Sequence, residues 1–253
     1  MTERGITDRA AQSGSTPRPF RAVVLGAGRG TRLAPLTERV PKILAPVAGL
    51  PLLEHQLRYL ECEGATEVAV NAHHLADAVS SFVRNRHERL PVRVSVEPEL
   101  LGTAGALLPL RDFLTETFVV LYGDVLSDVD LQQLLAAHRR RSAIATVVYT
   151  EDPEMHGKGL LVVEPDGRVS AFLEKPEEIP KGAVVSSGIY VLEPAILEYV
   201  SVGADFGFDV FPAALAAGRP VYGFNHDGYL CDVGSPTALD RAERDLAAGA
   251  LRW

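Results

Sequence analysis

The sequence is poor in cysteine, in basic charge and in long apolar runs, and each shortage excludes a class of protein. Cys62 and Cys231 are its only cysteines and form no C-x-x-C pair, so a disulfide framework is excluded. We interpret both as reduced thiols of a cytoplasmic protein. No apolar run reaches the ~18 residues that a membrane-spanning helix needs, so no membrane partner is expected.

The shortage of basic charge argues against nucleic acid as a partner. The chain carries 25 lysines and arginines against 33 aspartates and glutamates, which gives a formal net charge of −8. A protein that binds nucleic acid without regard to sequence needs a basic face, so nucleic acid is not an expected partner. The composition, 47% hydrophobic and 23% charged over 253 residues, is that of an ordinary globular protein with a substantial core.

Two common phosphate-binding motifs are missing as well. No G-x-x-x-x-G-K-[ST] run occurs, which excludes a P-loop. The turn after the strand-like run 21–25 lacks the third glycine of a dinucleotide-binding turn, because Thr31 stands in its place.

A segment almost without side chains, Gly26 to Gly30, is present instead. Its backbone N–H groups are free to surround an anion, and Arg32 and Lys42 supply positive charge beside it. A tight strand-to-helix turn that binds nothing would explain the glycines alone but leaves the two cations unexplained. The combination favours a nucleoside triphosphate as ligand.

Strand-like and helix-like segments alternate in the first half of the chain. We predict strands at 21–25, 67–71, 92–96 and 118–122, and helices at 51–63, 75–88 and 104–114. This alternation predicts an α/β fold with a doubly wound, mostly parallel, Rossmann-like sheet, whose ligands bind beyond the carboxyl ends of the strands.

The second half contains fewer helices between its strands and is expected to cap the ligand pocket. We predict strands at 143–149, 160–164, 168–173 and 184–192, and helices at 194–200, 209–217 and 236–249. Asp166-Gly167 indicates a hairpin turn. Residues 1–19 are predicted to be a disordered tail, and 20–253 a single domain.

Two aspartates stand in strand-end turns, Asp124 after Gly123 and Asp232 before a short Val-Gly-Ser-Pro run. Mg²⁺ binds through one or two carboxylates together with substrate phosphates, so the pair could hold one Mg²⁺. Taken singly, each Asp is as well explained by capping or turn formation. Beside a phosphate-binding segment we favour the metal.

Two further motifs each have two interpretations when the residues alone are considered. Glu174-Lys175 could bind a sugar hydroxyl and a phosphate, or form a surface ion pair of little consequence. Gly102-Thr103 could let a flat base approach the backbone, or begin a helix packed closely on the sheet.

Taken together, these motifs resemble the sugar-1-phosphate nucleotidylyltransferases, also called NDP-sugar pyrophosphorylases. That family reads L-x-G-G/A-x-G-T-R-L-x-P-L-T, P-K, G-T-A-G-A, G-D, E-K-P and D-x-G-T/S-P. The order and spacing hold here from about residue 20 to 240. The form Gly-Thr-Ala-Gly-Ala-Leu is typical of mannose-1-phosphate and heptose-1-phosphate guanylyltransferases. Ser186, where Asn is usual, points toward a less common sugar.

The resemblance implies a role for each motif. Arg32 and Lys42 would contact the triphosphate and act in catalysis, and Asp124 and Asp232 would hold Mg²⁺. The residues implied to bind the nucleotide are Leu25, Gly26, Ala27, Gly28, Gly30, Thr31, Asn71, Glu97, Gly102 and Thr103. The residues implied to bind the sugar phosphate are Tyr122, Gly123, Gly159, Glu174, Lys175, Ser187, Gly188 and Asp209.

The resemblance also implies the reaction and its partners. Residues 20–140 would form the nucleotide-binding half and 141–253 the sugar-binding half. The chain would transfer a nucleoside monophosphate from an NTP, with GTP favoured, to a mannose- or heptose-type sugar 1-phosphate. Thymidylyl or uridylyl transfer to glucose 1-phosphate is an alternative, as is a non-catalytic subunit that senses nucleotide sugars. Whether identical chains associate into a homo-oligomer is left open.

Overall fold

The computed structural model describes residues 17–87 and 89–251, which divide into two compact units, each built from separated stretches of chain. Unit 1 takes in the chain as far as Val96, then Gly123–Gln132, and the chain from Tyr229 onward. Unit 2 comprises Glu97–Tyr122 and Gln133–Gly228. The bounds of these units therefore differ from those of the predicted halves, 20–140 and 141–253. The prediction that 20–253 is a single domain stays a prediction.

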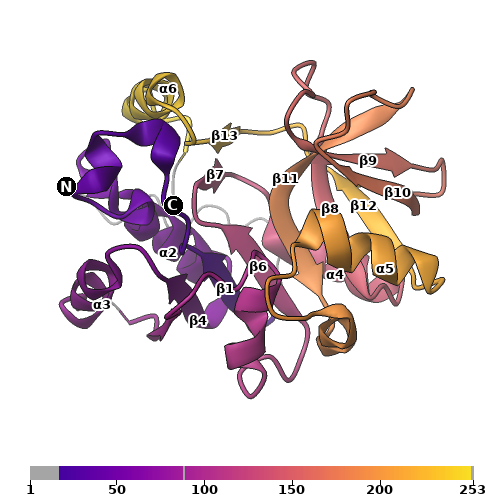
Figure 1. Cartoon of the computed structure of the whole chain (residues 1–253), viewed down its shortest axis with the longest axis horizontal. Helices are drawn as coiled ribbons and strands as arrows, with labels where there is room; N and C mark the ends of the chain where they lie inside the picture. Colours follow the sequence, from indigo (N-terminus) through magenta and orange to yellow (C-terminus); the bar gives the residue numbers. More distant parts are fainter. Residues whose placement is uncertain (1–16, 88, 252–253) are drawn as a thin grey trace. The chain divides into compact units, whose positions relative to one another are not determined.

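The described residues form thirteen strands and five α-helices, which keep the labels used in Figure 1. The strands are β1 Phe20–Leu25, β2 Pro46–Val47, β3 Leu50–Pro51, β4 Ala65–Ala72, β5 Val92–Val96, β6 Phe118–Tyr122, β7 Val125–Ser127, β8 Ala145–Thr150, β9 Gly159–Val163, β10 Val169–Glu174, β11 Ala183–Leu192, β12 Val221–Asn225 and β13 Leu230–Asp232. The helices are α2 Leu52–Cys62, α3 Ala76–Arg84, α4 Leu131–Arg140, α5 Phe211–Ala216 and α6 Pro236–Ala247.

Unit 1 is built on parallel strands, with β4 paired to β1 on one side and to β5 on the other. The central part of β1 is fully buried from Ala22 to Val24, as expected for a strand covered on both faces. Helices alternate with these strands along the chain, and α2 packs against β4 while α3 packs against β5. The predicted α/β class is therefore confirmed.

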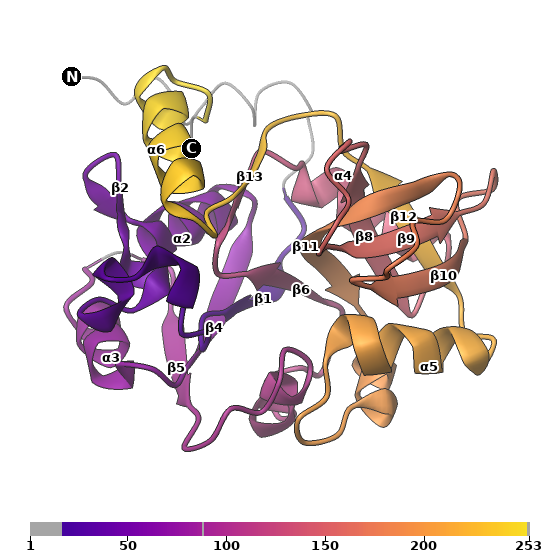
Figure 2. The ribbon, with the colours of Figure 1, turned by 45° about the horizontal axis from the view of Figure 1, so that its top comes forward.

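The last helix of the chain contributes to the core of unit 1. Ala242 on α6 packs in one buried cluster with Val47, Leu52, Leu126 and Val233, which come from the beginning and the middle of the chain. Figure 2 shows α6 lying beside β2. The core of unit 1 therefore includes residues from the C-terminal helix as well as from the beginning and the middle of the chain.

Unit 2 is mostly antiparallel. The long strand β11 pairs in antiparallel fashion with β6, β8 and β9, and β9 and β10 form a hairpin, while β12 runs parallel to β8. Gly167 occupies the predicted hairpin turn. Helix α5 packs against β10 and β12, and the rings of Phe172, Tyr190, Phe206 and Phe211 meet at centroid distances of 5.0–5.5 Å.

The predicted strands are all present, whereas several helices differ. The segment predicted as a helix at 104–114 is a 3-10 turn over Gly105–Leu110, in which Pro109 supplies no N–H donor for a longer helix. The segment predicted at 194–200 is likewise a 3-10 turn, Pro194–Tyr199. In the segment predicted at 209–217, a five-residue π turn, Phe206–Val210, precedes the short α5. Helix α4 and strands β7 and β12 were not predicted.

Three further observations concern the ends and surface of the chain. Residues 1–16 of the predicted tail lie outside the described residues, and the backbone of Arg18 exchanges hydrogen bonds with the Gln132 side chain at 2.9 and 3.1 Å. Cys62 and Cys231 are free thiols. Among the helices of the described residues, none combines the length and apolar character of a membrane span.

Candidate functional site

The glycine-rich segment leaves β1 in unit 1 and packs tightly at the end of that strand. The N–H of Gly26 donates to Asn71 Oδ1 at 2.6 Å, and the N–H of Gly123 donates to the Leu25 carbonyl at 2.8 Å. A Cβ atom at Gly26 would lie 2.6 Å from Ile43 Cδ1, and one at Gly123 would lie 2.5 Å from the Leu25 carbonyl oxygen. Both positions therefore require glycine because the packing leaves no room for a side chain.

Gly30 closes the segment in the left-handed backbone conformation, with φ at 63°. Its carbonyl accepts a hydrogen bond from the Thr37 hydroxyl at 2.9 Å, and His74 Nε2 lies 2.9 Å from the Thr37 carbonyl oxygen. A Cβ at Gly30 would lie 2.9 Å from Lys42 Cβ. The turn therefore brings Lys42 directly against the glycine-rich segment.

Gly28 differs from these neighbours. It is exposed, its backbone lies outside the left-handed region, and a Cβ placed there would meet no described atom within 4 Å. Neither the backbone nor the packing of the described residues requires a glycine at this position. Ala27 beside it is buried, whereas Thr31 and Arg32 beyond the turn are exposed.

Lys42 and Asp124 form an ion pair in unit 1. Lys42 Nζ lies 2.5 Å from Asp124 Oδ2, and their side chains are 11% and 23% exposed. Lys42 comes from the 3-10 turn Lys42–Leu44, and Asp124 stands just before β7. The cation predicted to contact phosphate and the aspartate predicted to hold metal are therefore direct neighbours.

Asp232 and Arg32 join the same region. Strands β7 and β13 pair in antiparallel fashion, with Asp232 opposite Val125, and the Val233 N–H donates to the Asp124 carbonyl at 2.7 Å. A Cβ at Gly234 would lie 2.8 Å from Arg32 Nη2 and 2.9 Å from Asp232 Oδ1. Unit 1 thus gathers both predicted cations and both predicted metal ligands beside the glycine-rich segment.

Asp124 and Asp232 are the residues predicted to hold Mg²⁺. Across the described part of the chain, no three acidic, histidine or cysteine side chains gather as a metal site made of protein alone. Asp124 and Asp232 stand on adjoining stretches of backbone, and their carboxylates match the chemistry of Mg²⁺, which takes oxygen ligands from one or two carboxylates and completes its shell with phosphates and water.

In unit 2, the segment predicted to lie near the base is packed on another part of the same unit. The Thr103 hydroxyl donates to Asp205 Oδ2 at 2.7 Å and accepts from the Phe206 N–H at 3.0 Å. A Cβ at Gly102 would overlap the Ala204 carbonyl oxygen. The glycine and the threonine are thus explained by packing as well, and their contact with a base stays a prediction. Glu97, also predicted to bind nucleotide, is buried and accepts a hydrogen bond from the Leu101 N–H at 3.1 Å.

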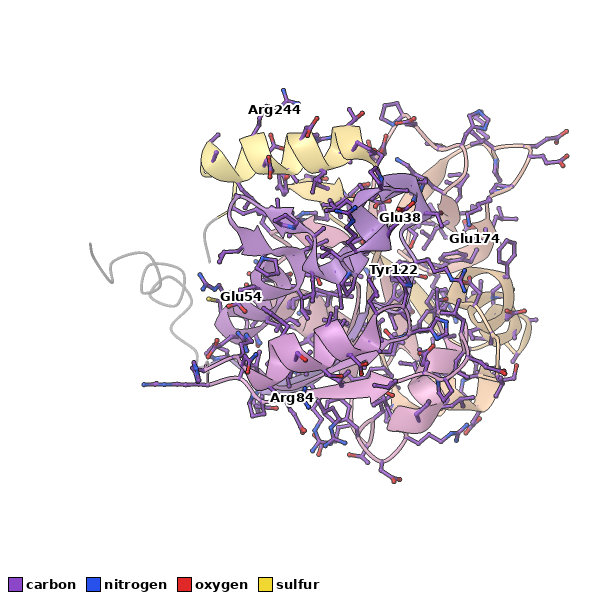
Figure 3. The ribbon with its side chains drawn as sticks, turned by 60° about the vertical axis from the view of Figure 1, so that its left-hand side comes forward. Glu38, Glu54, Arg84, Tyr122, Glu174 and Arg244 are labelled. Carbon is purple, nitrogen blue, oxygen red and sulfur yellow. The ribbon has the colours of Figure 1, made fainter. Side chains whose placement is uncertain are left out.

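Glu174 and Gly159 face each other across the β9–β10 hairpin in unit 2. Burial raises the pKa of the Glu174 carboxyl above its ordinary value, against the lowering effect of nearby Lys175. Lys175 Nζ lies 3.3 Å from Glu174 Oε1, and the Lys175 side chain is 58% exposed. The pair therefore offers one half-buried carboxyl and one accessible ammonium group. Figure 3 labels Glu174 and also Tyr122, another predicted sugar-side residue of this unit.

The other predicted sugar-side residues have mixed surroundings. The Ser187 side chain is buried and donates to the Val148 carbonyl at 3.0 Å. A Cβ at Gly188 would lie 3.0 Å from the Tyr122 ring, and burial raises the pKa of Tyr122 well above its ordinary value. Asp209 is exposed, and its Oδ2 accepts from the Asp205 N–H at 2.7 Å. The side chains of Ser187 and Asp209 are therefore both engaged by backbone groups.

Comparison with known proteins identifies the family. The family described as nucleotidyl transferase matches residues 21–249. The chain belongs to this nucleotidyl transferase family. The resemblance derived from the motifs is therefore confirmed at the level of the family.

Two curated relatives and one solved structure are similar to this nucleotidyl transferase. A UTP–glucose-1-phosphate uridylyltransferase of Synechocystis is 34% identical over 92% of this chain and 65% of its own length. A mannose-1-phosphate guanyltransferase beta-A of Xenopus laevis is 33% identical over 86% of this chain and 62% of its own. The chain thus spans somewhat less than two thirds of these relatives. HddC from Yersinia pseudotuberculosis, complexed with GMP-PN, has the same fold, with a TM-score of 0.76 at 24% identity over 90% of this chain and 99% of that one.

Three residues of this nucleotidyl transferase were not predicted as site residues. Ile43 fills the space beside Gly26 and Gly123. Asp205 accepts hydrogen bonds from Thr103 and from the turn amides, and Gly207 lies against Glu174. Each of these residues contacts residues that are distant in sequence, so no local motif identifies it. Asp205 is a partial exception, because an aspartate directly before a helical turn is a common N-cap.

Proposed function

We propose that this chain transfers a nucleoside monophosphate from an NTP to a sugar 1-phosphate, with release of pyrophosphate. The observation that carries the proposal is in unit 1. Arg32, Lys42, Asp124 and Asp232 gather beside a glycine-rich segment, and within it Gly28 lacks a side chain that the fold itself would tolerate. Membership of the nucleotidyl transferase family supports the same reaction class.

In the proposed reaction, a phosphate oxygen of the sugar 1-phosphate attacks the α-phosphorus of the NTP. A new P–O bond forms as the bond to the β-phosphate oxygen breaks, and pyrophosphate leaves with the electron pair. Two negatively charged substrates must be brought together, so positioning and charge neutralisation provide most of the catalysis. Arg32 would stabilise charge on the leaving pyrophosphate, and Lys42 would exchange part of its interaction with Asp124 for phosphate contacts.

Asp124 and Asp232 would hold Mg²⁺, which when bound neutralises phosphate charge during transfer. Lys175 would contact the phosphate of the sugar substrate, and Glu174 would accept hydrogen bonds from its hydroxyl groups. The free thiols Cys62 and Cys231 are compatible with a reducing compartment, so we place the reaction in the cytoplasm.

GTP with a mannose- or heptose-type sugar 1-phosphate is the substrate pair that we favour, on the form of the Gly102–Leu107 segment and on the guanyltransferase relatives. A specific observation supports a second pair, UTP with glucose 1-phosphate, because the Synechocystis uridylyltransferase is 34% identical over 92% of this chain.

The test is a panel of GTP, UTP, dTTP, CTP and ATP against mannose, glucose and heptose 1-phosphates, with pyrophosphate release measured in the presence of Mg²⁺. Arg32→Ala should lower kcat/KM by about 10²- to 10³-fold, the usual effect of removing one preorganised charge-stabilising donor. Arg84→Ala, which changes an exposed arginine on α3 of the same unit (Figure 3), is the matched control. Nucleotide binding without pyrophosphate release from any pair would instead favour a sensing subunit.

A further inference from the structure

Gly207 occupies a position where the backbone permits any residue but the packing does not. It lies in the turn Phe206–Val210 of unit 2, and its φ is outside the left-handed region. A Cβ placed there would lie 2.5 Å from Glu174 Oε2 and 2.9 Å from Phe172 Cε1. A Cβ at 207 would therefore force the side chains on β10 to shift, whereas the turn itself would accept it.

Gly159 repeats this situation at the same carboxyl group. It pairs with Glu174 across the β9–β10 hairpin, and a Cβ there would lie 2.8 Å from the same oxygen, Oε2. Its φ is also outside the left-handed region. Two glycines from different chain segments thus leave just the space that one carboxylate oxygen occupies.

The turn that carries Gly207 is itself firmly held. Asp205 Oδ1 accepts from the N–H groups of Gly207 and Phe208 at 2.7 and 3.2 Å, and Asp205 Oδ2 accepts from the Thr103 hydroxyl at 2.7 Å. Phe206 is fully buried. Because the turn cannot easily retreat, an added methyl group at 207 would have to displace the Glu174 side chain.

We propose that Gly207 is a positioning residue that, with Gly159, fixes the Glu174 carboxylate in the place from which it binds the sugar 1-phosphate. This inference rests on the proposed function for its kinetic consequence, whereas the placement of Glu174 by Gly207 is a property of unit 2 alone. A side chain at 207 would move the carboxylate without touching the residues that hold the triphosphate.

The kinetic test compares Gly207→Ala with wild type, using GTP and mannose 1-phosphate, or UTP and glucose 1-phosphate if the wild type prefers that pair. The KM for the sugar phosphate should rise by about ten- to a hundredfold, the effect of misplacing a binding group by ~1 Å. The affinity for the NTP, measured by calorimetry, should stay within about twofold. Gly223→Ala is the matched control, because its Cβ would lie 2.7 Å from the Tyr149 ring in the same unit and its nearest atoms belong to Tyr149 and Val163.

A Cβ at 207 would also approach Phe172, so a double-mutant cycle is needed to distinguish the effect of the Glu174 contact from that of the Phe172 contact. Glu174→Asp shortens the side chain and withdraws the carboxylate from position 207. In that background Gly207→Ala should change the sugar-phosphate KM by less than about twofold, since contacting residues couple. An equal factor in both backgrounds would assign the effect to Phe172 packing and overturn the proposal.

A measurement that needs no activity completes the test. Carbon NMR titration of Glu174 should show a pKa nearer its ordinary value in Gly207→Ala and in Gly159→Ala than in wild type, because the displaced carboxyl is less buried. Identical titration curves in all three proteins would overturn the positioning role. If the wild type turns over no substrate pair, the proposed function fails while this titration still decides the placement of Glu174.

Discussion

At the scale of single residues, the glycines of unit 1 fall into two groups, those that the packing explains and one that it does not. Gly26, Gly30 and Gly123 lack side chains because protein atoms occupy the space where a Cβ would lie. Gly28 lacks one although the described structure leaves the space open and the backbone is ordinary. We attribute this difference to the triphosphate, whose close approach to the backbone a methyl group would hinder.

We therefore predict that a side chain at position 28 weakens NTP binding without lowering the free energy of unfolding. Gly28→Ala should leave the free energy of unfolding unchanged or raise it by about 0.4–1 kcal/mol, because alanine reduces the entropy of the unfolded chain at a compatible site. The same variant should bind NTP more weakly, whereas Gly26→Ala should lose stability as well. Urea unfolding and calorimetry with Mg²⁺ and GTP measure the two effects. Unaltered nucleotide affinity in Gly28→Ala would contradict the role given to this position.

The predicted catalytic and metal-binding residues stand in or beside motifs that are local in the sequence. Arg32 and Lys42 were selected as cations beside the glycine-rich segment, and Asp124 and Asp232 as aspartates in strand-end turns. The structure places all four in unit 1, and their roles stay a prediction. Asp205 and Gly207 escaped because their partners, Thr103 and Glu174, are distant in sequence. Such contacts are set by tertiary packing, which no spacing rule reports.

At the scale of elements, strands were predicted better than helices. The buried strands are continuous apolar runs bounded by turn residues, a pattern that survives without tertiary information. The helix predicted at 104–114 is a 3-10 turn because Gly105 and Pro109 weaken α-helical hydrogen bonding. The segment predicted at 194–200 is also a 3-10 turn, although Pro194 stands at its first position, where an α-helix tolerates proline. Helix α4 was overlooked although Leu131, Leu134 and Leu135 are buried at helical spacing.

Helix α4 is also tied to its neighbours by a titratable group, which gives a prediction for pH. His138 is buried, its Nδ1 lies 2.8 Å from Thr146 Oγ1 on β8, and its Nε2 lies 3.0 Å from Glu193 Oε1 just after β11. Burial lowers the pKa of His138 below 6.5, although Glu193 opposes this shift. A lowered pKa means that the folded state binds fewer protons than the unfolded state. Stability is therefore full above pH 6.5 and is lost as the pH falls through the folded-state pKa.

His138→Gln should abolish this part of the pH dependence. Between pH 7.5 and 5, wild type should lose up to ~1.4 kcal/mol per pH unit more than the variant, which corresponds to one proton. Urea unfolding across that range measures the slope. His156→Gln removes an exposed histidine of the same unit and should follow wild type. A parallel pair of slopes for wild type and His138→Gln would mean that the imidazole is not coupled to folding.

At the scale of the whole molecule, both compact units are discontinuous in sequence. The segment 97–122, expected in the nucleotide-binding half, belongs to unit 2, and the chain from Tyr229, expected in the sugar-binding half, belongs to unit 1. Sequence order suggested a simple division because it records neighbours along the chain and not which buried faces meet. The β13 turn with Asp232 illustrates this, since it is delivered to unit 1 from near the end of the chain.

The C-terminal helix should therefore matter for nucleotide binding although no binding motif lies on it. Ala242 on α6 is fully buried against Val47, Leu52 and Val233, whereas Ala247 on the same helix is exposed. Ala242→Asp would place an unpaired carboxylate in this core and should lower the free energy of unfolding by roughly 3–4 kcal/mol. Ala247→Asp should change it by less than ~0.5 kcal/mol.

Both variants add the same charge to the same helix, so the comparison isolates the contact between α6 and the core of unit 1. Urea unfolding should be read with and without Mg²⁺ and NTP, because a ligand that binds only the folded state raises the unfolding midpoint. The midpoint shift caused by nucleotide should be retained in Ala247→Asp and reduced in Ala242→Asp. Equal stability of the two variants would show that α6 is dispensable for unit 1, and that the β13 turn reaches Asp124 without it.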